Sequence, residues 1–196
     1  VPLLTDAITS VTAEQPEMSV EIVEDTSDTL LGLIDAGRLD LAVCRTSVSQ
    51  TPWLYDSVLV QEETLAVIAN PAHPLARRRR VALTDLAEYR WVVYRANMPM
   101  RLLLEREFHD AGLRFPTHLL ETTSAFATLS LLQKNVSLVA LVSIDVARFC
   151  TGHGVACTLP VKLSSRSEPY ELVTRRDAPL SPGARMLMKA IVAGGA

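Results

Sequence analysis

Short polar side chains stand before the apolar stripes of several predicted helices. Ser27 precedes such a stripe, and its hydroxyl is suited to accept hydrogen bonds from the first backbone N–H groups of a helix. Thr26 lies before it in the same polar turn, and Thr123 and Ser124 form a similar turn in the second half of the chain. Helix amino ends offer N–H donors and the positive end of the helix dipole, so these turns suit an anion.

One arginine and one further loop complete the candidates. Arg45 follows an apolar run that ends at Val43, and its planar guanidinium suits a carboxylate held at two points. Asn97 and Met98 lie in the loop after another predicted strand. Two alternatives stay open: the hydroxyl residues only cap helices, and Arg45 is a solvated loop residue. The predicted binding residues are Thr26, Ser27, Arg45, Asn97, Met98, Thr123 and Ser124.

The sequence shows no arrangement that is typical of catalysis. Glu62 and Glu63 are adjacent, so on an extended strand their side chains point to opposite faces. There is no G-x-S-x-G, P-loop or H-E-x-x-H motif. No acid or nucleophile stands at a convincing spacing from any histidine, namely His73, His109, His118 and His153. We therefore expect that the chain is not an enzyme.

Cysteine usage indicates the compartment and bears on metal binding. Cys150, His153 and Cys157 are three possible zinc ligands, but a closed structural site needs four and no fourth Cys or His is near. We expect buried free thiols there, and no metal or other cofactor. With Cys44 the cysteines are three in number and form no C-x-x-C pair. This favours reduced thiols in the cytoplasm over a disulfide framework.

The composition is that of a globular protein. The chain has 196 residues and a mass of 21.5 kDa, with 48% hydrophobic and 21% charged residues. Its net charge of −3 and pI near 5.8 argue against DNA binding by this segment, because phosphate contacts require a basic excess. The basic run at residues 77–80 has no interleaved aromatics, which favours a solvated loop. No apolar run reaches the roughly 18 residues of a membrane span, so no membrane contact is expected.

Helices and strands are predicted to alternate. Apolar spacing predicts helices from residue 3 to about 15, behind Ser27 to Gly37, over 102–112, 126–132 and 143–150, and from Ser181-Pro182 onward. Short apolar runs predict strands at residues 20–23, 39–43, 91–94, 118–121, 138–142 and 170–174. Strand, helix and strand at this spacing favour βαβ units and a parallel sheet.

Two similar α/β halves predict two lobes. The apolar stretch over residues 58–70 is long enough to cross between them, and a return crossing is best placed at residues 167–169. Lobe one is then residues 1–68 with 167–196, and lobe two is residues 69–166. Two crossings make a hinge and a cleft, where open α/β sheets bind ligands.

Several motifs resemble the LysR-type transcriptional regulators. The stretch over residues 21–43 looks like that family's first-lobe signature, most specifically in the hexapeptide Gly-Arg-Leu-Asp-Leu-Ala that starts at Gly37. The run from Asn70 to Leu75, with its His-Pro-Leu, and the run from Leu180 to Arg185 also match. The resemblance spans essentially the whole chain in the right order.

The resemblance implies a two-lobed α/β fold of the type 2 periplasmic-binding-protein class, each lobe a mixed, mostly parallel sheet flanked by helices and the two hinged by two crossover segments. It implies an effector-binding domain in which Ser27 and Arg45 match effector-contacting positions. The family's winged helix-turn-helix, its linker helix and the first strand of lobe one would precede Val1. The implied partners are a carboxylate or sugar-like effector, further copies in a homodimer or homotetramer, and DNA through that missing domain. The alternative is a transport solute-binding protein with the same fold.

Overall fold

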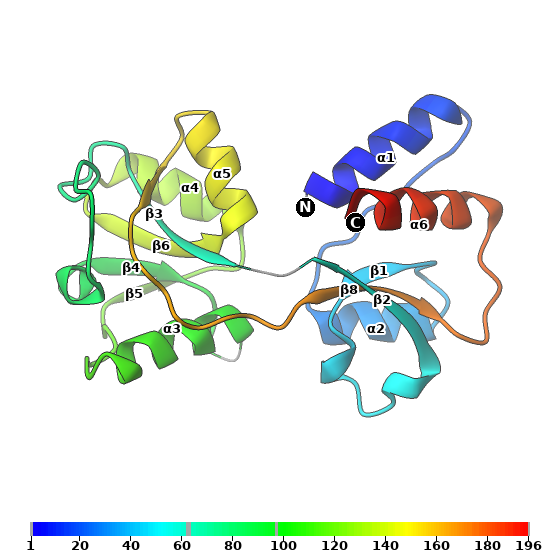
Figure 1. Ribbon diagram of the computed structural model, residues 1–196, viewed down its shortest axis with the longest axis horizontal. Coiled ribbons are helices and arrows are strands. Elements are labelled where there is room, and N and C mark those ends of the chain that lie inside the picture. Colours follow the sequence, from blue (N-terminus) through cyan, green and yellow to red (C-terminus); the bar gives the residue numbers. More distant parts are fainter. Residues whose placement is uncertain (1, 62–63, 97, 196) are drawn as a thin grey trace. The chain divides into compact units, whose positions relative to one another are not determined.

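The computed structural model describes residues 2–61, 64–96 and 98–195, in two compact α/β units (Figure 1). Unit 1 comprises Val1–Glu62 and Glu168–Ala196, and unit 2 comprises Glu63–Ser167. The first boundary between the units was expected after residue 68. That position lies inside strand β3 (Leu65–Ala69), and this strand pairs with two strands of unit 2, so the boundary comes before it. Hydrogen-bonded pairing decides to which unit this strand belongs, whereas its apolar pattern only marks it as a strand.

Unit 1 is a three-stranded sheet with helices on both faces. Its strands lie in the order β1 (Ala42–Cys44), β8 (Tyr170–Arg175) and β2 (Tyr55–Gln61), and both pairings are antiparallel. Its helices are α1 (Pro2–Glu14), α2 (Ser27–Asp35) and α6 (Pro182–Gly195). Two short 3-10 turns, Thr46–Val48 and Pro52–Leu54, connect β1 to β2.

Alternation along β8 divides the core of unit 1 into two clusters. Val173 packs with the apolar stripe of α2, and Leu172 packs with α1 and α6. Figure 1 shows α2 on one side of this sheet and α1 with α6 on the other. The stripe predicted for α2 is confirmed, since Leu30, Leu31 and Ile34 are buried. Gly37, at φ 64°, follows the helix in the left-handed conformation expected of it.

The sheet of unit 1 differs from the prediction in two respects. Residues 20–23 form no strand, and Ile22 and Val23 are exposed. Both described pairings are antiparallel, whereas a βαβ unit with parallel pairing was expected. An apolar run predicts extended backbone, but its partner is chosen by residues far away in the sequence. Local pattern therefore leaves pairing and direction open.

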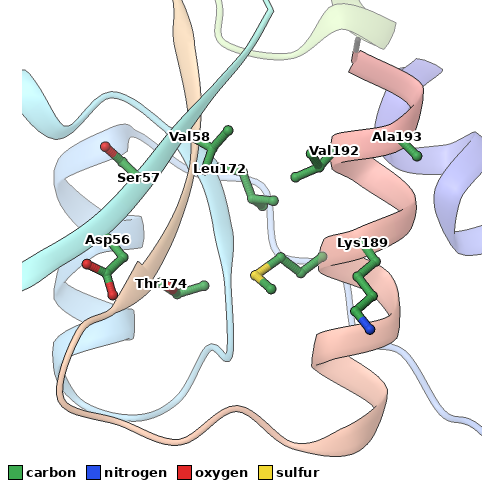
Figure 2. A pocket seen from close by; sticks show the side chains of 9 residues that line it. Asp56, Ser57, Val58, Leu172, Thr174, Lys189, Val192 and Ala193 are labelled. Carbon is green, nitrogen blue, oxygen red and sulfur yellow. The ribbon is translucent and has the colours of Figure 1, made fainter.

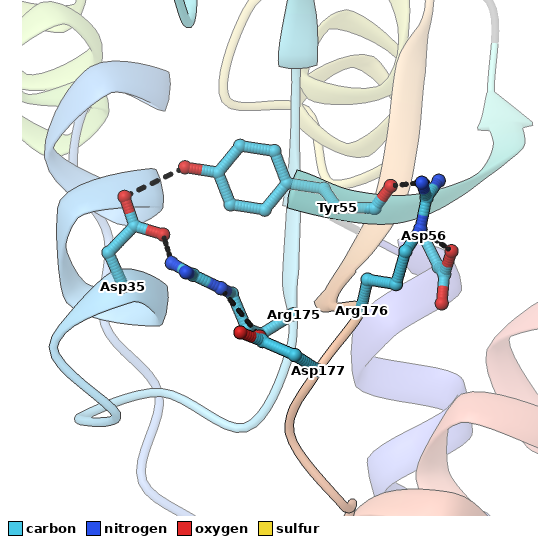
Figure 3. A network of polar contacts seen from close by, with 6 residues as sticks. All are labelled: Asp35, Tyr55, Asp56, Arg175, Arg176 and Asp177. Carbon is cyan, nitrogen blue, oxygen red and sulfur yellow. Dashed lines mark hydrogen bonds and ion pairs between the residues drawn. The ribbon is translucent and has the colours of Figure 1, made fainter. Parts of the chain in front are cut away.

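A polar network joins α2 to β2 and to the end of β8 (Figure 3). The Tyr55 hydroxyl donates to Asp35 Oδ2 at 2.9 Å, and the Arg175 guanidinium bonds the other oxygen of that carboxylate. Arg175 Nε also pairs with Asp177 Oδ1 at 2.8 Å. The six side chains drawn are Asp35, Tyr55, Asp56, Arg175, Arg176 and Asp177.

Unit 2 is a five-stranded mixed sheet. Its strands lie in the order β5 (Leu119–Glu121), β4 (Arg90–Val93), β6 (Leu138–Ser143), β3 and β7 (Cys157–Leu159). Strands β5, β4 and β6 are mutually parallel, and β3 is antiparallel to β6 and β7. The helices are α3 (Pro99–Asp110), α4 (Ala125–Lys134) and α5 (Ile144–Gly152), and a 3-10 turn spans Leu83–Leu86. The α/β class is confirmed, with a mixed sheet in unit 2, whereas the described pairings of unit 1 are antiparallel and not mostly parallel as expected.

The three parallel strands determine where the turns of unit 2 lie. Each of β4, β5 and β6 is followed by a helix, so the helix amino ends lie at one edge of the sheet. Apolar side chains on one face of this sheet surround Trp91 and Phe108, whose rings meet edge-on at 5.7 Å. The predicted helices of unit 2 are all present. The short strand β7 was missed, and β3 lies in the stretch over residues 58–70 that was expected to be a crossing. None of the described helices is both long and apolar enough to cross a membrane.

Candidate functional site

The amino end of α2 is capped by Thr26 rather than by Ser27. The Thr26 hydroxyl accepts the backbone N–H of Thr29 at 3.3 Å. Ser27 is the first residue of the helix, and its Oγ accepts the backbone N–H of Arg45 at 3.2 Å. The prediction that Ser27 is the cap is therefore wrong by one residue. Both residue types cap helices, so spacing alone did not distinguish them.

Arg45 is buried at the end of β1. The residue is 7% exposed, its Nε donates to the backbone carbonyl of Glu168 at 2.9 Å, and its guanidinium lies 4.0 Å from the ring centre of Tyr170. The alternative of a solvated loop arginine is therefore wrong. Stacking on an aromatic ring together with a hydrogen bond holds the planar guanidinium in one orientation.

An acidic residue that the sequence argument missed lies beside these groups. Glu171 Oε2 accepts the backbone N–H of Thr46 at 3.0 Å and also its hydroxyl, and Oε1 accepts the Ser57 hydroxyl at 2.9 Å. Burial alone would raise the pKa of Glu171, but these hydrogen bonds outweigh it and lower the pKa. One feature of the sequence could have pointed to Glu171. It is a charged residue within the predicted strand 170–174, and no residue nearby in the sequence is a clear partner for it.

In unit 2, Ser124 caps α4 as predicted. Its Oγ accepts the backbone N–H of Ala127 at 3.2 Å. Thr122, which belongs to the predicted turn but not to the predicted binding residues, accepts the backbone N–H of Ser124 at 3.0 Å. Thr123 lies between them and is exposed. The turn therefore carries three hydroxyl side chains in a row after β5.

The second turn of unit 2 precedes α3. Met98 occupies the N-cap position and is half-buried, while Asn97 lies outside the described residues. Arg101, in the first turns of α3, is 7% exposed and pairs with Glu121 at 3.0 Å and with Glu105 at 2.7 Å. Two carboxylates within the unit balance this cation, so we do not count it among the anion-binding candidates.

The structure gathers the candidates into two groups, each within one unit. Thr26, Ser27 and Arg45 lie together where β1 ends and α2 begins. Met98 follows β4, and the turn with Thr123 and Ser124 follows β5. Because β4 and β5 are neighbouring parallel strands, these two turns lie at the same edge of the unit 2 sheet.

A pocket of about 420 Å³ lies elsewhere in unit 1, between α6 and strands β2 and β8 (Figure 2). Its walls are mostly apolar, and none of the seven candidate residues lines it. It is therefore separate from the candidate site. The lining residues are Asp56, Ser57, Val58, Leu172, Thr174, Met188, Lys189, Val192 and Ala193.

Cys150, His153 and Cys157 lie in unit 2, whereas Cys44 directly precedes Arg45 at the end of β1. Within the described residues, no three His, Cys, Asp or Glu side chains are gathered as a metal site would require. His153 stacks on Phe149 with ring centres 4.2 Å apart. Cys44 is fully buried, and its pKa is raised to about 12, mainly by burial and further by the charge of Glu171. Burial also raises the pKa of Cys150 and Cys157, so all three thiols stay protonated near neutral pH.

A family model described as the LysR substrate binding domain matches residues 2–196. Among curated proteins, the chain is similar to the HTH-type transcriptional regulator GbpR from Azospirillum brasilense. The two are 27% identical over 192 residues, which cover 97% of this chain and 56% of GbpR. The chain spans about half the length of the curated relatives that it matches first.

Solved structures agree on the fold. The effector binding domain of QuiR in complex with shikimate is 13% identical, with a TM-score of 0.74 and coverage of 98% of this chain and 90% of that one. The CcmR regulatory domain of Synechocystis PCC6803 in complex with 2-PG is 16% identical, with a TM-score of 0.75 and the same coverages. These likenesses show the type 2 periplasmic-binding-protein-like fold, and the family model distinguishes a regulator from a transport protein that shares it. The chain belongs to the LysR-type transcriptional regulators and is their substrate-binding domain.

Proposed function

We propose that this domain senses a small anionic metabolite through Ser27 and Arg45. The observation that carries the proposal is the burial of Arg45 directly after β1, where its backbone N–H donates to Ser27 Oγ on the first residue of α2. A charged side chain is rarely buried unless it has a structural or functional role, because its desolvation costs free energy. The backbone of Arg45 lies beside the amino end of α2, and a helix amino end also favours an anionic ligand.

The groups around Arg45 and the amino end of α2 suit a carboxylate. A guanidinium meets a carboxylate through two parallel N–H donors, and the first turn of α2 adds backbone N–H groups and the positive end of its dipole. Hydroxyl groups from Thr26 and Ser27 supply short-range donors. Glu171 and Thr46, close by, suit hydroxyl groups on the same ligand, so a hydroxylated carboxylate fits the residues best.

The turns of unit 2 form a second group of candidates for ligand contacts. Met98, Thr123 and Ser124 stand at helix amino ends, as the residues of unit 1 do. Shikimate, a hydroxylated carboxylate, is the molecule bound to QuiR in the similar structure. The likeness supports this ligand class for the present domain. A sugar-like metabolite is the second candidate, favoured by the run of hydroxyl groups after β5.

Effector binding would act on transcription by changing populations. A ligand that binds one arrangement of the two units more tightly shifts the equilibrium toward it. In a homodimer or homotetramer, that shift would reach a DNA-binding domain of the kind that HTH-type regulators carry, in the cytoplasm and without catalysis. DNA contact would then belong to that other domain, in agreement with the net charge of −3.

Thermal unfolding tests the proposal. The chain is unfolded with shikimate, benzoate, succinate and galactose, alongside Arg45→Ala and the control Arg38→Ala, whose arginine is exposed. A ligand at about a hundred times its dissociation constant adds about 2.7 kcal/mol. For this chain length that raises Tm by roughly 5–10 °C.

The variants separate the ligand classes. A carboxylate effect that is lost in Arg45→Ala and kept in Arg38→Ala supports the anion site. A galactose effect that is indifferent to Arg45 retains the sensor and rejects the anion. A carboxylate effect that survives in Arg45→Ala contradicts the role of this residue.

A further inference from the structure

Glu107 holds part of the segment that returns from unit 2 to unit 1. The residue lies on α3 and is 9% exposed. Its Oε1 accepts the backbone N–H of Ser164 at 2.8 Å and also that of Ser165. A buried carboxylate that binds two consecutive amides is a charge-assisted contact, stronger than the solvent contacts that loops usually make. The returning chain is thus fixed to unit 2 up to Ser165.

Arg45 and Ser47 hold the same segment within unit 1. The carbonyl of Glu168 accepts from Arg45 Nε at 2.9 Å, and its carboxylate Oε2 accepts from the Ser47 hydroxyl at 2.6 Å. Two residues later, the Tyr170 ring lies against the Arg45 guanidinium. The main chain, a charged side chain and a ring of one short stretch are therefore fixed to the loop after β1.

We propose that residues 164–170 form a strap, anchored to unit 2 by Glu107 and to unit 1 by Arg45. Glu168 and Tyr170 are then the positioning residues of Arg45, and only Arg166 and Ser167 lie between the two anchors.

The strap provides a route by which effector binding at Arg45 affects the segment that connects the two units. This step rests on the proposed function, in which Arg45 takes up the anion. The guanidinium orientation that Tyr170 and the Glu168 carbonyl impose is the one offered to the ligand. An occupied Arg45 therefore keeps the strap in place, because releasing the strap would require that orientation to be given up.

Cleavage by trypsin after Arg166 measures the anchors without any ligand. Arg166 is exposed and stands between the anchors, and cleavage requires the strap to detach. Losing a charge-assisted hydrogen bond corresponds to a change of about tenfold or more in the detached population. We expect Glu107→Ala and Arg45→Ala each to accelerate this cleavage by that factor.

Matched variants separate anchoring from general destabilisation. Glu107→Gln keeps an acceptor oxygen and should be cleaved at a rate between those of wild type and Glu107→Ala. Arg106→Ala and Arg38→Ala, at exposed positions, should cleave at the wild-type rate after Arg166. Cleavage after Arg79, in the loop before the turn Leu83–Leu86, reports on the rest of unit 2. Unchanged cleavage after Arg166 in both Glu107→Ala and Arg45→Ala overturns the strap.

Repeating the digestion with an anion tests the route to the effector. With the carboxylate that raises Tm most, at about ten times its dissociation constant, cleavage after Arg166 should slow by about tenfold. The rate after Arg79 should not change. If a carboxylate binds through Arg45 and cleavage after Arg166 is unaffected, the route is rejected and the proposed function stands. If no carboxylate binds, the proposed function fails and takes the route with it, while the digestion without ligand still decides the anchors.

Discussion

The hydrogen bond from the Tyr55 hydroxyl to Asp35 is a contact whose loss can be measured. The hydroxyl donates at 2.9 Å in the network that joins α2 to β2, and the residue is 3% exposed. A hydrogen bond to a charged group contributes about 1.5 kcal/mol, so Tyr55→Phe should lower Tm by about 3–6 °C. Tyr89→Phe is the control, because among the described residues the Tyr89 hydroxyl has no hydrogen-bond partner. Equal effects of both substitutions would contradict the network.

His73 makes the stability of unit 2 depend on pH. The residue is 3% exposed, its Nδ1 accepts the backbone N–H of Leu75 at 3.1 Å, and its Nε2 is buried without a partner among the described residues. Burial lowers the pKa of His73 below its ordinary value of 6.5. The unfolded chain therefore binds the proton more readily. The contribution of neutral His73 is complete above pH 6.5 and is lost as the pH falls from there through the folded pKa.

Urea unfolding at about pH 7 and about pH 5 measures this linkage. The wild-type midpoint should fall on acidification, and His73→Gln should reduce that fall. His109→Gln, at an exposed position, is the matched control. A wild-type pH dependence retained in full by His73→Gln would show that other groups carry it.

The sequence identified residues whose types suit a binding site, but it could not predict the environment of those residues in the fold. Arg45 is recognisable in the sequence as a cation at a strand end, but its burial depends on Glu168, 123 positions away, and on Tyr170. Glu171 was missed for the same reason, since its partners Thr46 and Ser57 are brought to it by strand pairing. Tertiary contacts of this kind leave no local periodicity.

At the scale of elements, the cap of α4 can be tested on adjacent residues. Ser124 accepts the Ala127 N–H, whereas its neighbour Thr123 is exposed in the bend before it. Loss of an N-cap hydroxyl costs about 1 kcal/mol, so Ser124→Ala should lower Tm by about 2–4 °C. Thr123→Ala should change Tm by much less. A larger decrease of Tm in Thr123→Ala than in Ser124→Ala would show that Thr123 is the cap. The predicted cap of α2 was wrong in the same way, since Thr26 and not Ser27 caps that helix.

The elements themselves could be predicted better than their pairing. Helices with a stripe and a terminating glycine, such as α2 before Gly37 and α3 before Gly112, were found from periodicity and turn chemistry. Strand β7 was missed because three residues, one of them a threonine, give too little alternation. Residues 20–23 have the strand pattern and no described partner. Direction and order in a sheet are tertiary properties.

At the scale of the whole molecule, each unit has its own core. Leu141 is 3% exposed among the apolar residues around Trp91 in unit 2, and Val173 is fully buried in unit 1. Leu141→Ala should cost about 2–5 kcal/mol and speed amide exchange in β3 and β6 while leaving β8 protected. Val173→Ala should show the reverse pattern. Uniform acceleration in both variants would mean that the units unfold as one.

Calorimetric titration with the carboxylate that raises Tm most measures whether Arg45 receives a small anionic effector. Charge-assisted bonds to a buried guanidinium contribute enough that Arg45→Ala should weaken binding by about tenfold or more. Arg38→Ala should bind as the wild type does. Weaker binding in Arg45→Ala alone is expected if Arg45 holds the carboxylate, whereas equal affinity in wild type and Arg45→Ala would show that this residue does not receive the effector.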